Sequence, residues 1–236
     1  MNRERSILLG LLILGVALGY SLGSAGGSDA TTAVSGPLGL VKSSVARVLG
    51  VVRSWPMGSN ERRTGIVRVR HELFDFQEIA RRALGQHWKG LSPAEQDEFV
   101  QLFTDALDRE FIAGLDTYSS DRVTFLGEVI DGDWAQVRSR IIPDTGAAIL
   151  VDYRLHEANQ RWAVYDVVWD HVSLVASYRS QFNSIIRSGS VPQLLERMRA
   201  DRLRRHERST QTALAPNRLA AGLLVAVLAR HAPTSK

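Results

Sequence analysis

The chain has 236 residues, 44% of them hydrophobic, which is enough for one domain with a real core plus appendages. It contains no cysteine, which excludes disulfides, a lipid-modified cysteine and thiol chemistry. Residues 31–196 hold 18 basic and 21 acidic side chains, whereas Arg197–Lys236 holds nine basic and two acidic ones. The net charge of +4 therefore comes from the tail, and we expect no nucleic-acid binding by the folded domain.

The first 30 residues have the pattern of an export signal. Arg3 and Arg5 give a positive start, Ile7–Leu22 is apolar and uncharged, and Gly23–Ala30 consists mainly of small residues. The apolar run is shorter than the roughly 20 residues that a membrane span needs. We expect a cleaved signal peptide over residues 1–30, with an uncleaved inner-membrane anchor as the alternative.

Helical signals open the body of the chain. Apolar residues at helical spacing predict a first helix over Leu38–Ser54. The next stretch, Trp55–Gly65, contains proline, glycine and asparagine, and its sequence predicts a loop. A second helix is expected to begin at Asp75, where Glu78 completes the pattern of a capping box, and to end at Gly85.

A clearer helix start follows at Ser92-Pro93-Ala94-Glu95. It combines an N-cap, a proline in the first turn and a glutamate at the third position. The long helix that it opens has a wide apolar face, which includes Phe103, and is expected to run to about Tyr118.

Strand patterns come next. Alternation of apolar and polar residues, with many β-branched and aromatic side chains, predicts four strands over Val123–Ile130, Trp134–Ile142, Ala148–Leu155 and Trp162–Trp169. Short connections, one with an unusual backbone angle expected at Asn159, make neighbouring strands antiparallel. Ser173 and Ser190 are the expected N-caps of two further helices. The sequence thus predicts an α+β fold, a four-stranded antiparallel meander packed against several helices.

The end of the chain differs from the body. Six arginines lie within Arg197–Arg208, and Arg218–Ala229 is apolar but too short to span a bilayer. We divide the chain after the export signal into a domain over residues 31–200 and a basic and apolar tail over residues 201–236. The tail is a candidate for contact with a membrane surface, and the alternative is a solvated end.

The sequence shows no pattern of a catalytic or metal site. Asp170-His171 is the strongest candidate for a catalytic pair, and a hydrolase built on it is the alternative function. Such an enzyme also needs a nucleophile, which the sequence does not place, so we favour a loop histidine. His87 and His156 lack the spacing of metal ligands. We expect no enzyme activity, no cofactor and no metal.

Four segments of the chain resemble one known family. They are Phe74–Trp88 (FDFQEIARRALGQHW), Val151–Leu155 (VDYRL), Trp162–Val168 (WAVYDVV) and Val172–Phe182 (VSLVASYRSQF). In order and spacing they are similar to the MlaC family of periplasmic phospholipid carriers, also called toluene-tolerance proteins. The resemblance covers about residues 37–200.

The resemblance implies a periplasmic protein with an apolar cavity between sheet and helices. The cavity would hold the acyl chains of a glycerophospholipid and leave the headgroup near solvent. The implied partners are an inner-membrane ABC transporter complex of the Mla type and an outer-membrane lipoprotein-porin complex. Such a shuttle maintains the lipid asymmetry of the outer membrane. A related family associated with hopanoid biosynthesis makes a different lipid the alternative cargo.

The family's lipid-facing role is carried over to residues on one face of the predicted strands and on the two adjoining helices. They are Val137, Ile141, Ile149, Val151, Tyr153, Val167, Trp169, Tyr178 and, as a weaker candidate, Phe103. The choice depends on strand phase, because a slip of one residue turns a strand's side chains to the other face. Arg179 is expected to orient a phosphate, with a surface or structural ion pair as the alternative. Trp169-Asp170-His171 departs from the family pattern, in which an aliphatic residue precedes acidic and small ones.

Overall fold

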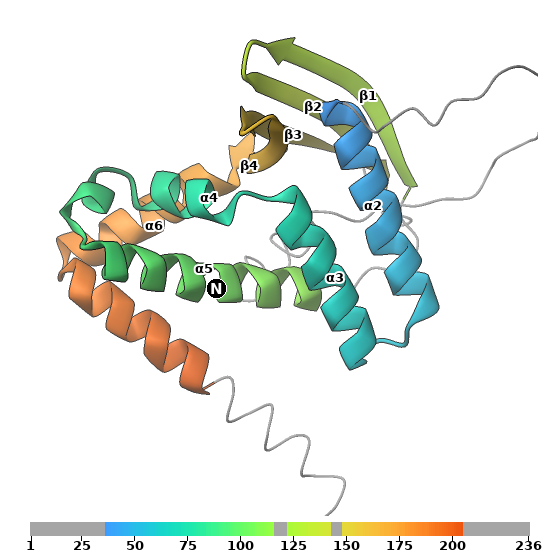
Figure 1. Ribbon diagram of the computed structural model, residues 1–236. Coiled ribbons are helices and arrows are strands. Elements are labelled where there is room, and N and C mark those ends of the chain that lie inside the picture. The colour runs from blue at the N-terminus through green and yellow to red at the C-terminus, as the bar shows by residue number, and fades with distance from the viewer. Residues whose placement is uncertain (1–35, 116–121, 143–147, 205–236) are drawn as a thin grey trace, which may run out of the picture.

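A computed structural model of the protein describes residues 36–115, 122–142 and 148–204. The predicted α+β fold is confirmed: antiparallel strands form one open sheet in the order β1-β2-β3-β4-β5, and helices pack against it (Figure 1). The predicted export signal, the short connection between the second and third predicted strands (residues 143–147) and the tail beyond Arg204 lie outside the described residues.

The sheet is a meander of hairpins. Its strands are β1 (Arg122–Asp131), β2 (Trp134–Ile142), β3 (Ile149–Ala158), β4 (Arg161–Trp169) and β5 (Val172–Ser173). The sequence did not predict β5, which is two residues long. Asn159 and Gln160 join β3 to β4 with φ of 52° and 61°, so the unusual angle predicted at Asn159 is confirmed. Asp170 and His171 join β4 to β5 in the same way, with φ of 40° and 70°.

The strands alternate between a face that packs on the helices and a face turned outward. Val137 pairs with Tyr153 and Tyr153 pairs with Val167, which carries one phase across three strands. In β4 the pairing then skips Tyr165, and this β-bulge changes the phase of the strand once. Val164 and Val167 are therefore both fully buried.

Two antiparallel helices, α2 (Pro37–Ser54) and α3 (Asn60–Leu73), form a hairpin beside the sheet (Figure 1). The prediction of a loop over Trp55–Gly65 is wrong, because α3 begins within it. The hydroxyl of Ser59 caps α3 by accepting the N–H of Arg62 at 3.2 Å. Few residues of α3 are apolar, so its periodicity is weak, and burial against α2 supplies most of its stability.

The helix α4 (Phe76–Leu84) begins as predicted, with the carboxylate of Asp75 accepting the N–H of Glu78 at 2.9 Å. The reciprocal half of the predicted capping box is not formed, because the carboxylate of Glu78 binds two arginines of α4 instead. The N–H of Asp75 donates to the carbonyl of Val164 at 2.9 Å, beside a parallel bridge between Phe74 and Val164. These contacts attach the start of α4 to β4.

The helix α4 ends at Gly85 (φ 61°), as predicted, and the 3-10 helix η2 (Gly85–Gly90) follows. The long helix α5 (Pro93–Leu115) opens with the complete capping box that the sequence predicted. The N–H of Ser92 donates to the carboxylate of Glu95 at 2.9 Å, and the N–H of Glu95 donates to the hydroxyl of Ser92 at 3.3 Å. The predicted end of this helix lies outside the described residues.

Helix α6 (Leu174–Arg187) starts at the predicted cap, where the hydroxyl of Ser173 accepts the N–H of Ala176 at 3.0 Å. The carboxylate of Asp166, buried in β4, accepts the N–H of Val175 at 3.1 Å and the hydroxyl of Ser173 at 2.7 Å. The start of α6 is therefore fixed to the sheet.

A last helix over residues 191–204 packs beside α5. Arg199 binds Glu98 at 2.5 Å, and Arg202 lies 3.4 Å from Asp105. Two arginines of the predicted basic cluster are thus paired with α5. Within the three described ranges, no helix is both long and apolar enough to cross a membrane.

Candidate functional site

The inner face of the sheet is a mainly apolar wall that also contains the buried hydroxyl of Ser139. Val137, Tyr153 and Val167 lie opposite one another on β2, β3 and β4, and Val151 and Trp169 form the next row. Trp169 is 9% exposed and the other four are at most 1% exposed. All five lie in one buried cluster with residues of the helices, as the strand alternation predicted.

The remaining predicted residues join the same layer. Ile141 of β2 is buried and pairs with Ile149 of β3, which is half-buried at the end of the wall. The rings of Phe103 in α5 and Tyr178 in α6 meet edge to face, with centroids 4.8 Å apart. The structure therefore brings all nine predicted residues together, while their contact with a lipid stays a prediction.

The helices cover the wall unevenly. The backbone of α2 comes close to β1 and β2, and that of α6 comes close to β4. The long helix α5 packs mainly against α3 and α4 instead of a strand. Large side chains such as Phe103, Tyr153 and Trp169 belong to the buried cluster that joins the helices to the middle of the sheet.

The two tyrosine hydroxyls of the layer are neutral. Burial raises the pKa of Tyr153 well above its ordinary value, although a hydrogen bond with Ser139 acts in the opposite direction. Burial also raises the pKa of Tyr178, and the carboxylate of Glu110, which accepts its hydroxyl at 2.7 Å, raises it further. Neither hydroxyl ionises near neutral pH, so the wall presents uncharged groups to anything that lies against it.

A charged group that sequence reasoning missed lies between α3 and α5. Arg70 is 5% exposed, and its guanidinium binds the carboxylate of Asp108. The guanidinium also lies 4.6 Å from the ring centroid of Phe111, and His71 Nε2 is 3.0 Å from the same carboxylate. Burial is the largest influence on Arg70 and lowers its pKa to about 10. The sequence signal was the spacing of buried Ile66, Val69 and Leu73 in α3, which places the adjacent Arg70 beside the core.

The predicted headgroup residue, Arg179 of α6, is exposed and contacts the end of α4. Its Nε donates to the main-chain carbonyl of Arg82 at 2.8 Å, and its stem lies over Gly85. Basic side chains commonly satisfy the last carbonyls of a helix in this way. The contact supports a structural role, and binding of a phosphate stays a prediction.

The candidate catalytic pair closes a hairpin. The carboxylate of Asp170 accepts the N–H of Leu150 at 3.0 Å, and the N–H of Asp170 donates to the Leu150 carbonyl at 3.0 Å. His171 is exposed at the second turn position. Across the described part of the chain, no three His, Asp or Glu side chains gather to hold a metal ion.

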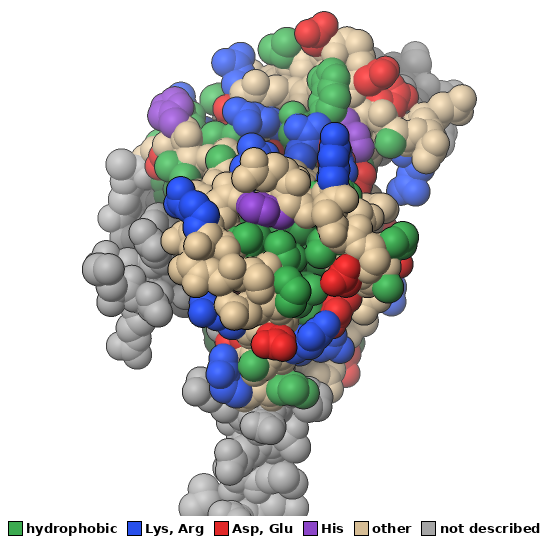
Figure 2. Space-filling model, turned by 90° about the vertical axis from the view of Figure 1, so that its left-hand side faces the viewer, with side chains coloured by type: hydrophobic (Ala, Val, Ile, Leu, Met, Phe, Trp, Pro, Cys, Tyr) green, Lys and Arg blue, Asp and Glu red, His purple; other side chains and the backbone are tan. Residues whose placement is uncertain are grey.

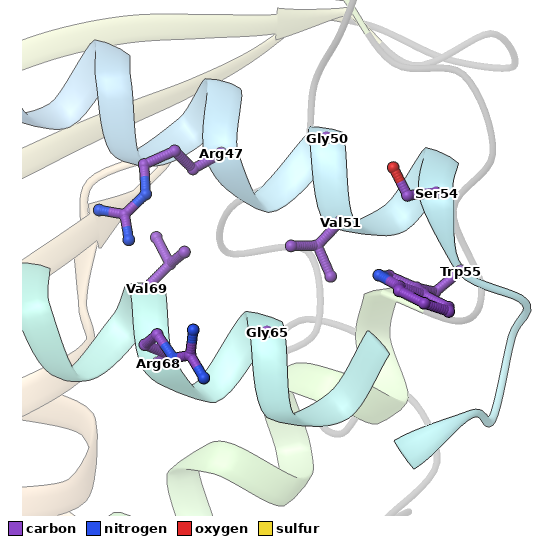
Figure 3. Close-up of a pocket in the computed structure, with 8 residues that line it drawn as sticks. All are labelled: Arg47, Gly50, Val51, Ser54, Trp55, Gly65, Arg68 and Val69. Atoms are coloured by element: carbon purple, nitrogen blue, oxygen red, sulfur yellow. The ribbon is translucent and has the colours of Figure 1, made fainter. Parts of the chain in front are cut away.

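Two hollows lie away from the wall. One, of about 320 Å³, is lined by residues of α2, α3 and Trp55 (Figure 3). The other, of about 170 Å³, lies between α5, α6 and the last helix and includes Leu102 and Phe182. Figure 2 shows hydrophobic side chains gathered in the middle of the end face of the molecule, with basic and acidic side chains around them.

These features define a class of protein: an α+β domain whose antiparallel sheet turns a continuous, uncharged inner face toward a layer of helices. The model of the family described as MlaC protein matches residues 42–200. The chain therefore belongs to the MlaC family.

One relative is the intermembrane phospholipid transport system binding protein MlaC of Haemophilus influenzae. It is 23% identical over 138 residues, which are 55% of this chain and 64% of the relative's length. A solved structure with the same fold is the phospholipid-binding protein of Ralstonia solanacearum in complex with a phospholipid. That match has a TM-score of 0.63 at 24% identity and covers 69% of this chain and 94% of the other.

Proposed function

We propose that the protein is a periplasmic carrier that binds a glycerophospholipid by its acyl chains and shuttles it between the outer membrane and an inner-membrane ABC transporter complex. Membership of the MlaC family is the observation that carries this proposal. Two similar proteins support it: the Haemophilus relative is a binding protein of an intermembrane phospholipid transport system, and the Ralstonia protein holds a phospholipid. The consequence for the cell is maintenance of outer-membrane lipid asymmetry.

The apolar wall suits this cargo. Two acyl chains against Val137, Val151 and Val167 would replace contacts among side chains with contacts to methylene groups. Each buried methylene contributes about 0.8 kcal/mol, so binding is tight even after the cost of ordering both chains. The hydroxyls of Tyr153 and Tyr178 are neutral, so neither adds a charge to the wall.

The proposed partners follow the family. They are an ABC transporter complex of the Mla type in the inner membrane and a lipoprotein-porin complex in the outer membrane. A hopanoid-type lipid is the alternative cargo, since the wall selects by shape and apolar surface and not by charge.

Carriage of a lipid involves no covalent step, so the proposal assigns no catalytic residue. Asp170 and His171 then have only a structural role, in the turn between β4 and β5. The variant His171→Ala should then retain its lipid, and neither the parent nor the variant should hydrolyse esters. An esterase activity of the parent that this change abolishes would favour the hydrolase alternative.

The first test is the lipid content of the purified, exported protein. Native mass spectrometry before and after lipid extraction should detect a phospholipid that accompanies the protein. A chain that carries no lipid from the periplasm and takes none from vesicles would contradict the proposal.

A substitution pair makes the test specific to the wall. Val151→Trp or Val167→Trp fills space on the inner face, and we expect lower lipid occupancy with at most a modest loss of stability. Leu150→Trp is the matched control, because Leu150 adjoins Val151 on β3 but is 38% exposed. Overpacking of a solid core costs about 1–3 kcal/mol. That loss with unchanged occupancy would remove these residues from the lipid site.

A further inference from the structure

The connection between α2 and α3 exposes two large apolar side chains. Trp55 is 46% exposed and Met57 is 64% exposed, and Pro56 lies between them. They lie at the end of the helical hairpin that is farther from the sheet (Figure 1). We call Trp55–Ser59 the hairpin tip. Neither apolar side chain belongs to the core cluster.

Basic side chains surround this tip. Residues 47–68 contain five arginines and one acidic residue, Glu61, although the body of the chain over residues 31–196 has 21 acidic and 18 basic side chains. Arg53 and Arg63 flank the tip, are exposed, and form no ion pair with a carboxylate of the described ranges. The hairpin is therefore a local positive region on a body with a small negative net charge.

A groove continues from the tip between the two helices (Figure 3). The side of Gly65 that faces α2 forms part of it, and a Cβ there would lie 2.9 Å from the methyl groups of Val51, which shows how closely the helices approach. The guanidinium groups of Arg47 and Arg68 lie at one end of the groove and the ring of Trp55 at the other. Glu72, which pairs with Arg47 at 2.5 Å, balances only one of these two charges.

The geometry matches the depth of a bilayer interface. Arg47 lies eight residues before Trp55 along α2, and at 1.5 Å per residue this is about 12 Å behind the tip. When the tip enters the boundary between headgroups and acyl chains, Arg53 and Arg63 therefore lie among the headgroups. Arg47 and Arg68 then lie at their outer edge. Tryptophan prefers this boundary, and arginine binds phosphate groups in a bidentate manner.

We propose that the hairpin tip is a docking surface for an anionic phospholipid bilayer. Trp55 and Met57 enter the interface, the arginines bind headgroup phosphates, and the groove receives one of these headgroups between Arg47 and Arg68. An acidic protein would satisfy the positive charge equally well, but a narrow convex tip with two exposed apolar side chains fits a deformable interface better. This surface shares no residue with the wall and functions whether or not a cargo is bound.

The absence of cysteine makes a direct test straightforward. Met57→Cys in the full-length chain is labelled with an environment-sensitive fluorophore and titrated with vesicles. Val172→Cys is the matched control, because Val172 is 60% exposed on β5, away from the hairpin. We expect a blue shift at position 57 with vesicles that contain phosphatidylglycerol, little with phosphatidylcholine alone, and none at position 172. The shift should require more lipid as salt rises.

The arginines supply the second part of the test. Each basic residue near an anionic leaflet contributes a factor of about five in affinity. Arg53→Gln and Arg63→Gln should each weaken the response at position 57 about fivefold, whereas Arg138→Gln, on the exposed face of β2, should not. No blue shift at position 57 would overturn the proposal and favour an acidic protein as the occupant. An equal shift at position 172 would also overturn it, because contact with the vesicles would then not be specific to the hairpin tip. Lipid content of the same proteins is measured separately, so failure of docking is distinguishable from failure of the carrier function.

Discussion

Replacement of Asp108 by alanine should destabilise the protein strongly, because it leaves the guanidinium of Arg70 buried without its carboxylate. Arg70 is 5% exposed, and its Nε makes no hydrogen bond in the described part of the chain. Its pKa falls from 12.5 to about 10 even with Asp108 beside it. At about 1.4 kcal/mol per pKa unit, the buried charge already costs about 3–4 kcal/mol at neutral pH. Loss of one partner of such a pair typically costs about 3–5 kcal/mol.

The free energy of unfolding in urea, followed by circular dichroism at pH 7, measures this cost. Asp108→Ala should lose about 3–5 kcal/mol, whereas Arg70→Met/Asp108→Leu should recover most of it, because no unpaired charge remains in the core. Glu72→Ala is the control. It breaks the exposed pair with Arg47, in which both side chains are nearly half exposed, and should cost less than about 1 kcal/mol.

The pH dependence has a definite sign. Arg70 is a base whose pKa is lower in the folded state, so the unfolded chain binds the proton more tightly. The cost is therefore constant below about pH 10 and declines only above it. A loss for Asp108→Ala as small as that for Glu72→Ala, or a double variant less stable than the single one, would refute this account of the buried pair.

Two further predictions concern local contacts. The hydrogen bond from Arg81, followed by the contacts with Arg82, lowers the pKa of Glu78 to about 2, so this group stabilises the fold above about pH 4.5 and ceases to do so as the pH falls toward 2. Glu78→Gln should flatten that part of an acid-unfolding curve, and an unchanged curve would contradict the assignment. Gly65→Ala should cost about 1–3 kcal/mol because its Cβ meets the methyl groups of Val51 at 2.9 Å. Adding Val51→Ala should restore part of the loss in thermal unfolding, and a single variant as stable as the parent would show that the helices separate easily.

The sequence predicted the elements whose signals are local. The alternation in β2 and β3, the cap at Ser92 and the turn at Asn159 each depend on a few neighbouring residues, and each is found in the structure. The wall could be predicted for the same reason, because strand phase alone decides which side chains turn inward.

The missed features depend on partners distant in the sequence. Helix α3 is mostly polar, and packing against α2, β4 and α5 makes it a stable helix. Because the predicted loop covered the start of α3 and no helix was predicted over residues 66–73, the buried Arg70 and its pairing with Asp108 could not be anticipated. Likewise, the carboxylate of Glu78 has arginines within reach, and the N–H of Asp75 finds a carbonyl in β4 instead of the capping carboxylate.

The attachment of Asp75 to Val164 has a consequence for the order in which the molecule is completed. Position 164 follows position 75 by 89 residues, so α2, α3 and α4 are complete in the chain before the strand that anchors the start of α4 becomes available. Until β4 reaches them, the apolar faces of these helices are uncovered, and uncovered apolar surface is what chaperones recognise. For an exported chain, the helices should therefore need a chaperone until the sheet is in place.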